Sequence, residues 1–359
     1  MYNIRPRLKK LFAEEQFDAL FIMNTEEKDA NFTYLTGFEG GVFEQSVLVA
    51  TRDGVTLLTS DLEEGIAAAE KPAGMEVKVI RGRAGLQKEL NALLNNRRVG
   101  IDGAFLPYSY YRFLKKHSKP KSIKDASALF AQARVVKDEE EISRIGRAAA
   151  ITKRALEAVP EYFKEGMTEQ QLAARFNFLM GEYGSPKQAF DSIVSFGANC
   201  ALPHHAPDST KLRQNSMVLL DVGAMYRNYC ADMTRTFIFK PDKSSAKYRR
   251  MNRLIEVVEE AQALGLRSIR PGVMGNAVHN AVADFIDRAD GGAYKGRFIH
   301  ALGHGIGLEV HDGEGLGLGK NVLKAGMVVS DEPGIYIPGF GGARKEDDVL
   351  VTKNGARFM

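Results

Sequence analysis

Short apolar runs alternate with helix-like patterns over the first 125 or so residues. Residues 17–23 form an apolar run typical of a buried strand, and a helical pattern over residues 7–15 precedes it. Two further strand-like runs, 46–50 and 55–60, flank Arg52-Asp53-Gly54, which predicts a hairpin because glycine can adopt the positive φ of a tight turn. The remaining elements expected here are helices over 61–70, 86–95 and 108–117 and strands over 75–80 and 98–102. The pattern predicts an α/β domain with a mixed sheet over residues 1–125.

The pattern changes over residues 126–137, which we interpret as a linker to a second domain at 138–359. Asp138 is a candidate N-cap because three glutamates occupy the first turn of a long amphipathic pattern behind it. Thr168 and Gln171 have the spacing of a capping box. The other expected elements are helices over about 245–264, ending near Gly265, and 275–288, with strands over 217–224, 231–240, 327–336 and 343–352. This order predicts an α+β domain with antiparallel strand pairs.

Composition and charge exclude several classes of protein. The chain has 359 residues, of which 44% are apolar and 26% are charged, and this is typical of a globular protein. A net charge of +4 without a run of basic residues does not indicate a nucleic-acid partner. No apolar stretch approaches the roughly 18 residues of a membrane span, and no signal peptide is recognised. The two cysteines, Cys200 and Cys230, are interpreted as buried thiols, and a cytoplasmic location is expected.

Two aspartates interrupt an apolar hairpin in the second domain. If Tyr226 and Arg227 form its loop, Asp221 and Asp232 face each other directly, with Cβ atoms about 5 Å apart. If the loop is Arg227 and Asn228, the two aspartates become a diagonal pair on the same face. Both registers place two carboxylates on one patch, and this is destabilising unless a cation lies between them.

The same arrangement recurs near the C-terminus, where Glu332 and Glu346 would oppose each other about a turn centred on Gly339. The alternative interpretation is two hairpins with solvent-facing acids, which is weaker because the pattern occurs twice in one domain. His304 lies between Gly303 and Gly305, and flanking glycines suggest that another group approaches closely there. Four carboxylates and one imidazole suit a pair of divalent cations such as Mn²⁺, Co²⁺, Zn²⁺ or Fe²⁺, as in two-metal hydrolases.

Several motifs in this order resemble the pita-bread metallopeptidases, which include methionine aminopeptidase, aminopeptidase P, prolidase and the metal-free creatinase. The motifs are Asp221-x10-Asp232, Gly-His304-Gly-Ile-Gly-Leu-Glu-Val-His311, Glu332-Pro-Gly-Ile-Tyr and Arg344-Lys-Glu346-Asp-Asp. Residues 31–38 and 135–141 resemble segments of the prolidase, aminopeptidase P and creatinase branch. The resemblance covers nearly the whole chain. It implies an α+β fold with a C-terminal pita-bread (creatinase/aminopeptidase-like) catalytic domain and an N-terminal α/β creatinase-like domain.

The resemblance also implies roles for individual residues. Two divalent metal ions, Mn²⁺ in preference to Co²⁺ or Zn²⁺, would be held by Asp221, Asp232, His304, Glu332 and Glu346. Glu332 would also accept the proton of the attacking water and pass it to the leaving nitrogen. His204 and His311 would contact the substrate and stabilise the tetrahedral intermediate. The implied substrate-binding residues are Phe190, Ile193, Tyr336 and Arg344, and Thr234 would support a ligand.

The implied activity is hydrolysis of an Xaa-Pro bond, and the segment after His311 bears on substrate length. Prolidases typically carry Pro-Arg in that segment, whereas this chain has Asp312 and Glu314 and no arginine. We therefore expect an Xaa-Pro aminopeptidase acting on longer peptides, with an Xaa-Pro dipeptidase (prolidase) as the alternative. A metal-free creatinase-like amidinohydrolase and an inactive peptide-binding scaffold are disfavoured because all the ligand residues are present. The expected partners are peptides with proline second and a second copy in a homodimer, without nucleic acid or membrane.

Overall fold

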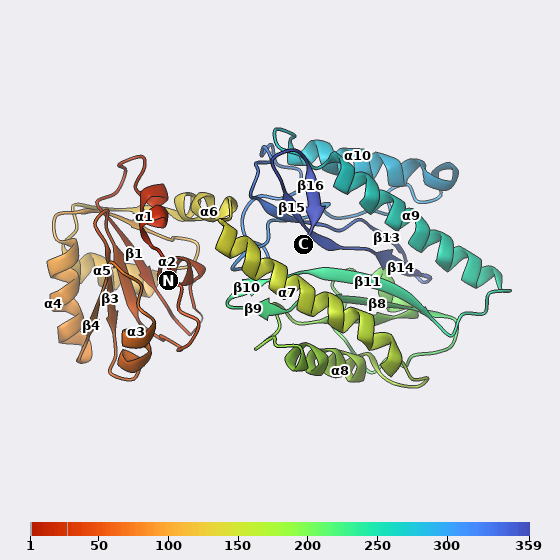
Figure 1. Cartoon of the computed structure of the whole chain (residues 1–359), viewed down its shortest axis with the longest axis horizontal. Coiled ribbons are helices and arrows are strands. Elements are labelled where there is room, and N and C mark those ends of the chain that lie inside the picture. Colours follow the sequence, from red (N-terminus) through yellow and green to blue (C-terminus); the bar gives the residue numbers. More distant parts are fainter. Residues whose placement is uncertain (1, 27) are drawn as a thin grey trace. The chain divides into compact units, whose positions relative to one another are not determined.

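The computed structural model describes residues 2–26 and 28–359, and the chain forms two compact units, Met1–Arg134 and Val135–Met359 (Figure 1). The segment that we expected to be a linker, 126–137, contains the helix α6 (Ser127–Val135). The boundary between the units therefore falls near the end of a helix.

The first unit is built on a six-stranded mixed sheet with the order β4-β3-β2-β1-β5-β6. Its strands are β1 (Ala19–Met23), β2 (Val47–Ala50), β3 (Val55–Thr59), β4 (Met75–Val79), β5 (Arg98–Ile101) and β6 (Ser122–Asp125). The pairs β1–β2 and β2–β3 are antiparallel, whereas β3–β4, β1–β5 and β5–β6 are parallel. The β2–β3 pairing confirms the predicted hairpin around Arg52-Asp53-Gly54, and the mixed sheet is confirmed as well.

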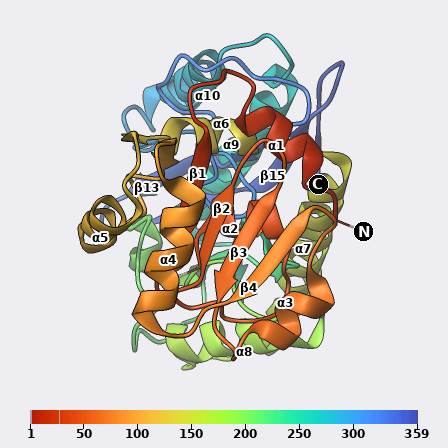
Figure 2. The ribbon, with the colours of Figure 1, turned by 90° about the vertical axis from the view of Figure 1, so that its left-hand side faces the viewer.

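Helices cover this sheet. They are α1 (Arg5–Leu11), α2 (Ala30–Thr36), α3 (Glu64–Glu70), α4 (Gly82–Leu94) and α5 (Tyr108–Ser118). Leu90 and Leu94 of α4 and Leu114 of α5 are fully buried in one apolar cluster with residues of the strands, and Figure 2 shows α4 in front of the sheet. The sequence pattern did not predict α2, whose N-cap is Asp29 and which ends at Gly37 with a positive φ of 67°.

The second unit opens with two helices whose starts are confirmed as predicted. Asp138 and Glu141 form a capping box at the start of α7 (Glu139–Ala158), and Thr168 and Gln171 form another at the start of α8 (Glu169–Glu182). The other helices are α9 (Ala246–Ser268) and α10 (Gly275–Arg288).

Strands lie between these two pairs of helices (Figure 1). They are β7 (Ile193–Phe196), β8 (Ser216–Val222), β9 (Met225–Tyr226), β10 (Tyr229–Cys230), β11 (Met233–Phe239), β12 (Val328–Asp331), β13 (Gly334–Ile337), β14 (Gly341–Arg344), β15 (Asp347–Val351) and β16 (Ala356–Phe358). On the central strand β8, Val218 and Leu220 belong to the apolar core under α7 and α8, whereas Met217 and Leu219 belong to the core under α9 and α10. Because side chains alternate along a strand, Asp221 lies on the face that carries Met217 and Leu219.

Helix α9 differs from the prediction, because it does not end near Gly265 but continues to Ser268. Gly265 lies where the helix packs closely on β12, and a Cβ atom there would come within 2.4 Å of Asp331 Oδ1. The glycine therefore marks a close approach between two elements and not the end of the helix.

None of the helices that the structure describes is long and apolar enough to cross a membrane. Cys200 and Cys230 are free and buried, as expected, and burial raises the pKa of each thiol to about 12. Both thiols are therefore protonated and unreactive at neutral pH.

We predict that Gly265→Ala destabilises the second unit by about 1–3 kcal/mol, because the new methyl group overlaps the buried carboxylate of Asp331. The matched control is Gly181→Ala in α8, where a Cβ atom would meet no atom within 4 Å. That change should stabilise the protein by roughly 0.5–1 kcal/mol, because alanine loses less backbone entropy in a helix than glycine. Urea denaturation of both variants measures the difference, and equal stabilisation by both would contradict the close approach.

Candidate metal centre

The first acidic pair is held by the β8–β11 hairpin, and the structure selects the second of the two registers. Arg227 and Asn228 form the loop, with φ of 47° and 68°, and Tyr226 pairs with Tyr229. Positive φ at both loop residues is typical of the type I′ turn that matches the twist of a hairpin. In this register Asp221 pairs with Thr234. Asp232 is therefore the diagonal neighbour of Asp221 on the same face.

The second acidic pair lies in a long hairpin, at the break between its two hydrogen-bonded strand pairs, β12–β15 and β13–β14. Asp331 pairs with Asp347 in β12–β15, and Gly334 pairs with Arg344 in β13–β14. Both ladders keep one register about Gly339, so Glu332 and Glu346 oppose each other between them, as predicted. Their backbone N–H groups bond elsewhere, to Leu302 O and Thr234 O. The second of these bonds ties the two hairpins together.

His304 reaches this region on a loop that packs tightly against β12. A Cβ atom on Gly303 would lie 2.0 Å from Ser330 O, and one on Gly305 would lie 2.4 Å from Asp312 O. Only glycine allows such contacts, and this confirms the close approach predicted from the sequence. The backbone N–H of His304 donates to Ser330 Oγ at 3.0 Å.

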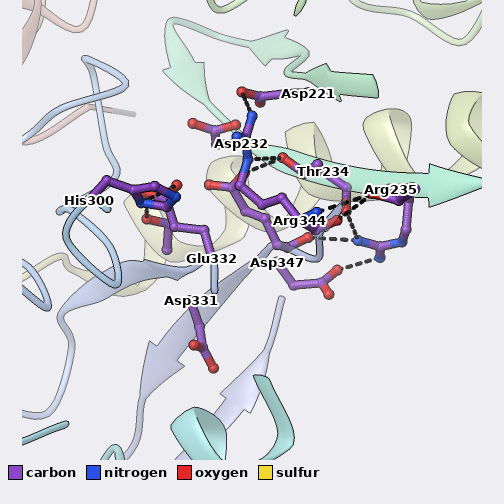
Figure 3. A network of polar contacts seen from close by, with 12 residues as sticks. Asp221, Asp232, Thr234, Arg235, His300, Asp331, Glu332, Arg344 and Asp347 are labelled. Carbon is purple, nitrogen blue, oxygen red and sulfur yellow. Dashed lines mark hydrogen bonds and ion pairs between the residues drawn. The ribbon is translucent and has the colours of Figure 1, made fainter. Parts of the chain in front are cut away.

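The predicted ligand residues lie together in the second unit, and Figure 3 shows Asp221, Asp232 and Glu332 among them. His304 Nε2 lies 3.6 Å from Asp232 Oδ2 and 3.5 Å from Glu332 Oε1. Asp232, His304 and Glu346 each offer a ligand atom within 4.8 Å of the others. Arg344 joins Asp221 to this group, since its Nη2 donates to Asp221 Oδ2 at 2.5 Å and its Nε lies 3.9 Å from Glu346 Oε2.

The electrostatics of the cluster are those of acids crowded in a buried place. Burial, followed by the charges of neighbouring carboxylates, raises the pKa of Asp232 and of Glu332 above the usual range. For Glu346, burial and then Asp221 raise the pKa to about 8. Burial and then His311 lower the pKa of His304 to about 4, so this imidazole is neutral at pH 7 and keeps a lone pair.

Three carboxylate oxygens in the cluster are buried without a hydrogen-bond donor: Asp221 Oδ1, Asp232 Oδ1 and Glu346 Oε1. Unsatisfied buried carboxylate oxygens are costly in free energy. Carboxylate oxygens and a neutral imidazole are also the ligands that divalent cations of the Mn²⁺, Co²⁺ and Zn²⁺ type bind. The residues of this cluster therefore fit a metal centre.

Neighbouring side chains hold the Glu346 carboxylate and the backbone next to the ligands. The Thr234 hydroxyl donates to Glu346 Oε2 at 2.6 Å, so Thr234 supports Glu346. The backbone N–H of Asp232 donates to Asp348 Oδ2 at 3.2 Å. Arg235 donates to Glu346 O and to Asp347 Oδ1, each at 2.6 Å (Figure 3). Such contacts hold ligand atoms in place before a metal binds.

Tyr336 and Arg344 were predicted to bind substrate, and in the structure both are buried and bonded to residues of the metal cluster or to each other. Arg344 is 3% exposed. Besides Asp221, it donates to Tyr336 Oη at 2.8 Å and to Thr234 Oγ1 at 3.0 Å. Its guanidinium is thus committed to contacts that position other residues of the cluster.

The remaining predicted residues surround the cluster. Ile193 pairs directly with Asp221 across β7–β8. The Phe190 ring packs on Gly223, where a Cβ atom would come within 2.8 Å of it. The exposed His311 has its ring centroid 4.1 Å from that of His304. Burial and then the nearby His204 lower the pKa of His311, so the exposed His204 also lies in this neighbourhood.

One residue of the site, His300, had no role assigned from the sequence. Its Nε2 lies 2.8 Å from Tyr336 Oη, and its Nδ1 lies 2.8 Å from Ala301 O and 3.8 Å from Glu332 Oε2. Figure 3 shows it beside Glu332. In the sequence, its position four residues before His304 was the feature that could have marked it as a site residue.

Comparisons with known proteins cover both units. The family model described as metallopeptidase family M24 matches residues 143–353, and that of the creatinase/prolidase N-terminal domain matches residues 5–136. The Xaa-Pro dipeptidase of Pyrococcus furiosus is 33% identical over 356 residues, covering 98% of this chain and 96% of that protein. Among solved structures, the prolidase from Pyrococcus horikoshii OT3 matches with a TM-score of 0.87 at 31% identity, covering 98% of this chain and 97% of that one. The X-Pro aminopeptidase from Thermotoga maritima matches with a TM-score of 0.87 at 30% identity and the same coverage.

The raised carboxyl pKa values predict how the stability of the metal-free protein depends on pH. A carboxyl group whose pKa is higher in the folded chain adds stability at low pH, and this stability is lost as the pH rises to the folded pKa. For Glu346 that window runs from its ordinary 4.5 to about 8. His304 has a pKa lowered from 6.5 to about 4, so its opposite contribution changes only below pH 6.5.

We therefore expect the melting temperature of chelator-treated protein to fall between about pH 6.5 and 8. The slope is at most about 1.4 kcal/mol per pH unit for each proton that the folded chain binds in excess. Added Mn²⁺ should remove the fall, and Glu346→Gln should reduce it. Thermal unfolding across this range is the measurement. A melting temperature that stays level or rises with pH would show that the carboxylates are not strained by their mutual repulsion.

Proposed function

The chain belongs to metallopeptidase family M24, and we propose that it is an Xaa-Pro dipeptidase, which hydrolyses dipeptides with proline in the second position. The observation that carries the proposal is the buried group of carboxylates with unpaired oxygens around a neutral His304. The substrate class rests on relatives named Xaa-Pro dipeptidase that match over nearly the full length. These relatives favour the dipeptidase over the aminopeptidase that we expected from the sequence.

The number of ligand residues supports two divalent ions. Four ionised carboxylates carry four negative charges, and Arg344 adds one positive charge close to Asp221 and Glu346. One divalent ion would leave a net charge of −1 and two ions a net charge of +1, so the charge allows either number, whereas four carboxylates and an imidazole offer more ligand atoms than one ion needs. We assign Asp221, Asp232, His304, Glu332 and Glu346 as the residues that would hold these ions. Mn²⁺ is our first choice, with Co²⁺ and Zn²⁺ as alternatives, because oxygen ligands dominate.

Bound ions of this kind polarise a carbonyl group and lower the pKa of a water molecule. The chain supplies the groups that move protons and hold the substrate. Glu332 has a pKa raised by burial and then by Glu346, so it can accept a proton from water and return it to the leaving nitrogen. Its Oε1 accepts a hydrogen bond from Ser330 Oγ at 3.3 Å, which holds the carboxylate in place.

The residues around the cluster are assigned to the substrate. His204 and His311 are exposed beside the buried ligands, and we assign them to the scissile carbonyl, where an imidazole N–H stabilises the charge that develops on oxygen. Phe190 and Ile193 lie beside Asp221 and supply apolar surface for a proline ring. Tyr336 and Arg344 act through Asp221 and His300, and their direct contact with substrate stays a prediction.

A second candidate function, Xaa-Pro aminopeptidase, is favoured by the charge near His311. Asp312 and Glu314 follow it, and no basic residue occurs before Lys320. A dipeptide places its carboxylate directly after proline, and an unpaired buried carboxylate is costly. Arg344 is 3% exposed and already bonds to Asp221, Tyr336 and Thr234, which limits its use as a partner for that carboxylate.

The two functions differ in the preferred substrate. We expect activity on Ala-Pro to disappear after dialysis against a chelator, to return with Mn²⁺, and to exceed that on Ala-Pro-Ala in kcat/KM. Ala-Ala serves as the control without proline. A clear preference for Ala-Pro-Ala would establish the aminopeptidase instead. Metal-loaded protein that cleaves neither peptide would indicate a peptide-binding scaffold.

We also predict that Asp232→Asn abolishes turnover without unfolding the protein. A neutral amide is a much weaker ligand for divalent ions than a carboxylate, whereas removal of one charge relieves repulsion in the metal-free cluster. The exposed Glu182→Gln removes the same charge outside the site and should keep full activity. Metal analysis, kcat and thermal unfolding of both variants test this. Normal turnover by Asp232→Asn with two ions bound would refute the assignment.

The homodimer and the cytoplasmic location remain predictions. The absence of nucleic-acid and membrane partners, expected from the charge pattern, is a prediction too. Sedimentation of the purified protein would determine its oligomeric state.

A further inference from the structure

A second polar network lies outside the metal cluster and is centred on Glu169, the first residue of α8. This carboxylate has no exposed surface. Its Oε1 accepts hydrogen bonds from Phe196 N at 2.7 Å and Asn199 Nδ2 at 3.0 Å. Its Oε2 accepts bonds from Asp208 N at 3.0 Å and His205 Nε2 at 2.6 Å. All four bonds reach a fully buried charge, where hydrogen bonds to an ionised acceptor are strongest.

The donors come from a single stretch of chain that carries His204. Phe196 ends β7, Asn199 lies in the short helix η2 (Gly197–Ala201), and the segment 202–210 follows it towards β8. Further bonds attach the same segment to the start of α8, from Glu169 N to Thr210 O and from Gln170 N to Asp208 O. Glu169 therefore fixes both ends of an exposed loop.

Within the segment 202–210, the His205 side chain bonds directly to Glu169, and the Asp208 carboxylate lies 4.0 Å from His205 Nε2. Since an ionised carboxylate only accepts, His205 Nε2 carries the proton in this pair. Its side chain is 11% exposed, whereas the adjacent His204 is exposed. The short helix η2 before this segment packs on β14, which carries Arg344, since a Cβ atom on Gly342 would lie 2.3 Å from Cys200 O. His204 follows η2 and is close enough to affect the pKa values of His300 and His311. The two neighbouring histidines thus have different surroundings, one anchored to α8 and one at the site.

We propose that Glu169 and His205 are positioning residues that hold His204 in its productive place beside the metal cluster. This inference rests on the proposed function of His204 in stabilising the transition state. A loop fixed before substrate arrives does not have to be ordered during the reaction, and small displacements of a transition-state contact reduce kcat strongly. His205 itself makes no contact with the reacting atoms, so it acts only through His204.

A double-mutant cycle tests this with Ala-Pro under one metal and pH. We expect His205→Ala to lower kcat about tenfold with KM changed less than about twofold, and His204→Ala to lower kcat by about two to three orders of magnitude. Combined with His204→Ala, His205→Ala should cause no further loss, because the residue that it positions is gone. His205→Gln, which restores an N–H donor, should recover most of the activity, and metal content should not change.

The matched control is Asp208→Ala in the same loop. It removes a carboxylate that accepts from Thr210 N and lies 4.0 Å from His205 Nε2, and it leaves the bonds from Asp208 N and His205 to Glu169. Its kcat should stay near that of the wild type. In the metal-free protein, amide hydrogen exchange over residues 202–210 should accelerate in His205→Ala and Glu169→Gln more than in Asp208→Ala. This measurement reports the order of the loop independently of turnover.

The outcomes distinguish failure of the positioning role from failure of the proposed function. A full tenfold loss from His205→Ala in the His204→Ala background, or a loss confined to KM, would overturn the positioning role while leaving the proposed function intact. Unchanged kcat in His205→Ala would overturn it as well. A metal-loaded wild type that does not cleave Ala-Pro would instead overturn the proposed function and, with it, this inference.

Discussion

Mutual repulsion among four crowded carboxylates is the constraint on which the second unit depends. Asp221, Asp232 and Glu346 are buried and the Glu332 side chain is 16% exposed, and like charges interact more strongly in such surroundings than in water. Burial and neighbouring charges raise the pKa of Asp232, Glu332 and Glu346, and the Arg344 guanidinium lies closest to Asp221. Such an arrangement persists only when the surrounding structure stabilises it, and it is relieved when cations bind.

Packing on both sides of the strands provides that stability. Alternation along β8 directs Val218 and Leu220 into the core under α7 and α8, and Leu219 into the core under α9 and α10. Asp221 follows Leu219 on the same face, so its position is a consequence of burying its apolar neighbours. Gly303 lies on the loop that packs against β12 of the other hairpin, and its close backbone contact with that strand brings His304 to the acids.

Around the ligands, the polar contacts form a frame that is set before any ion or peptide binds. Arg344 joins Asp221, Thr234 and Tyr336, while Arg235 bonds to Asp347 and the backbone of Glu346. Contacts of this kind orient ligand atoms and reduce the reorganisation needed in the reaction. The network around Glu169 extends the same principle to the loop of His204.

The sequence by itself determined what depends on local geometry. Capping residues fixed the starts of α7 and α8, and period-two alternation placed each acidic pair on one face, because the backbone of a helix or strand dictates which side chains share a side. Only the tertiary structure decided between the two hairpin registers, brought His300 to Glu332, turned Arg344 inward and continued α9 past Gly265. These features depend on how the turn is accommodated or on contacts between segments distant along the chain, and neither is encoded in the periodicity of a short stretch.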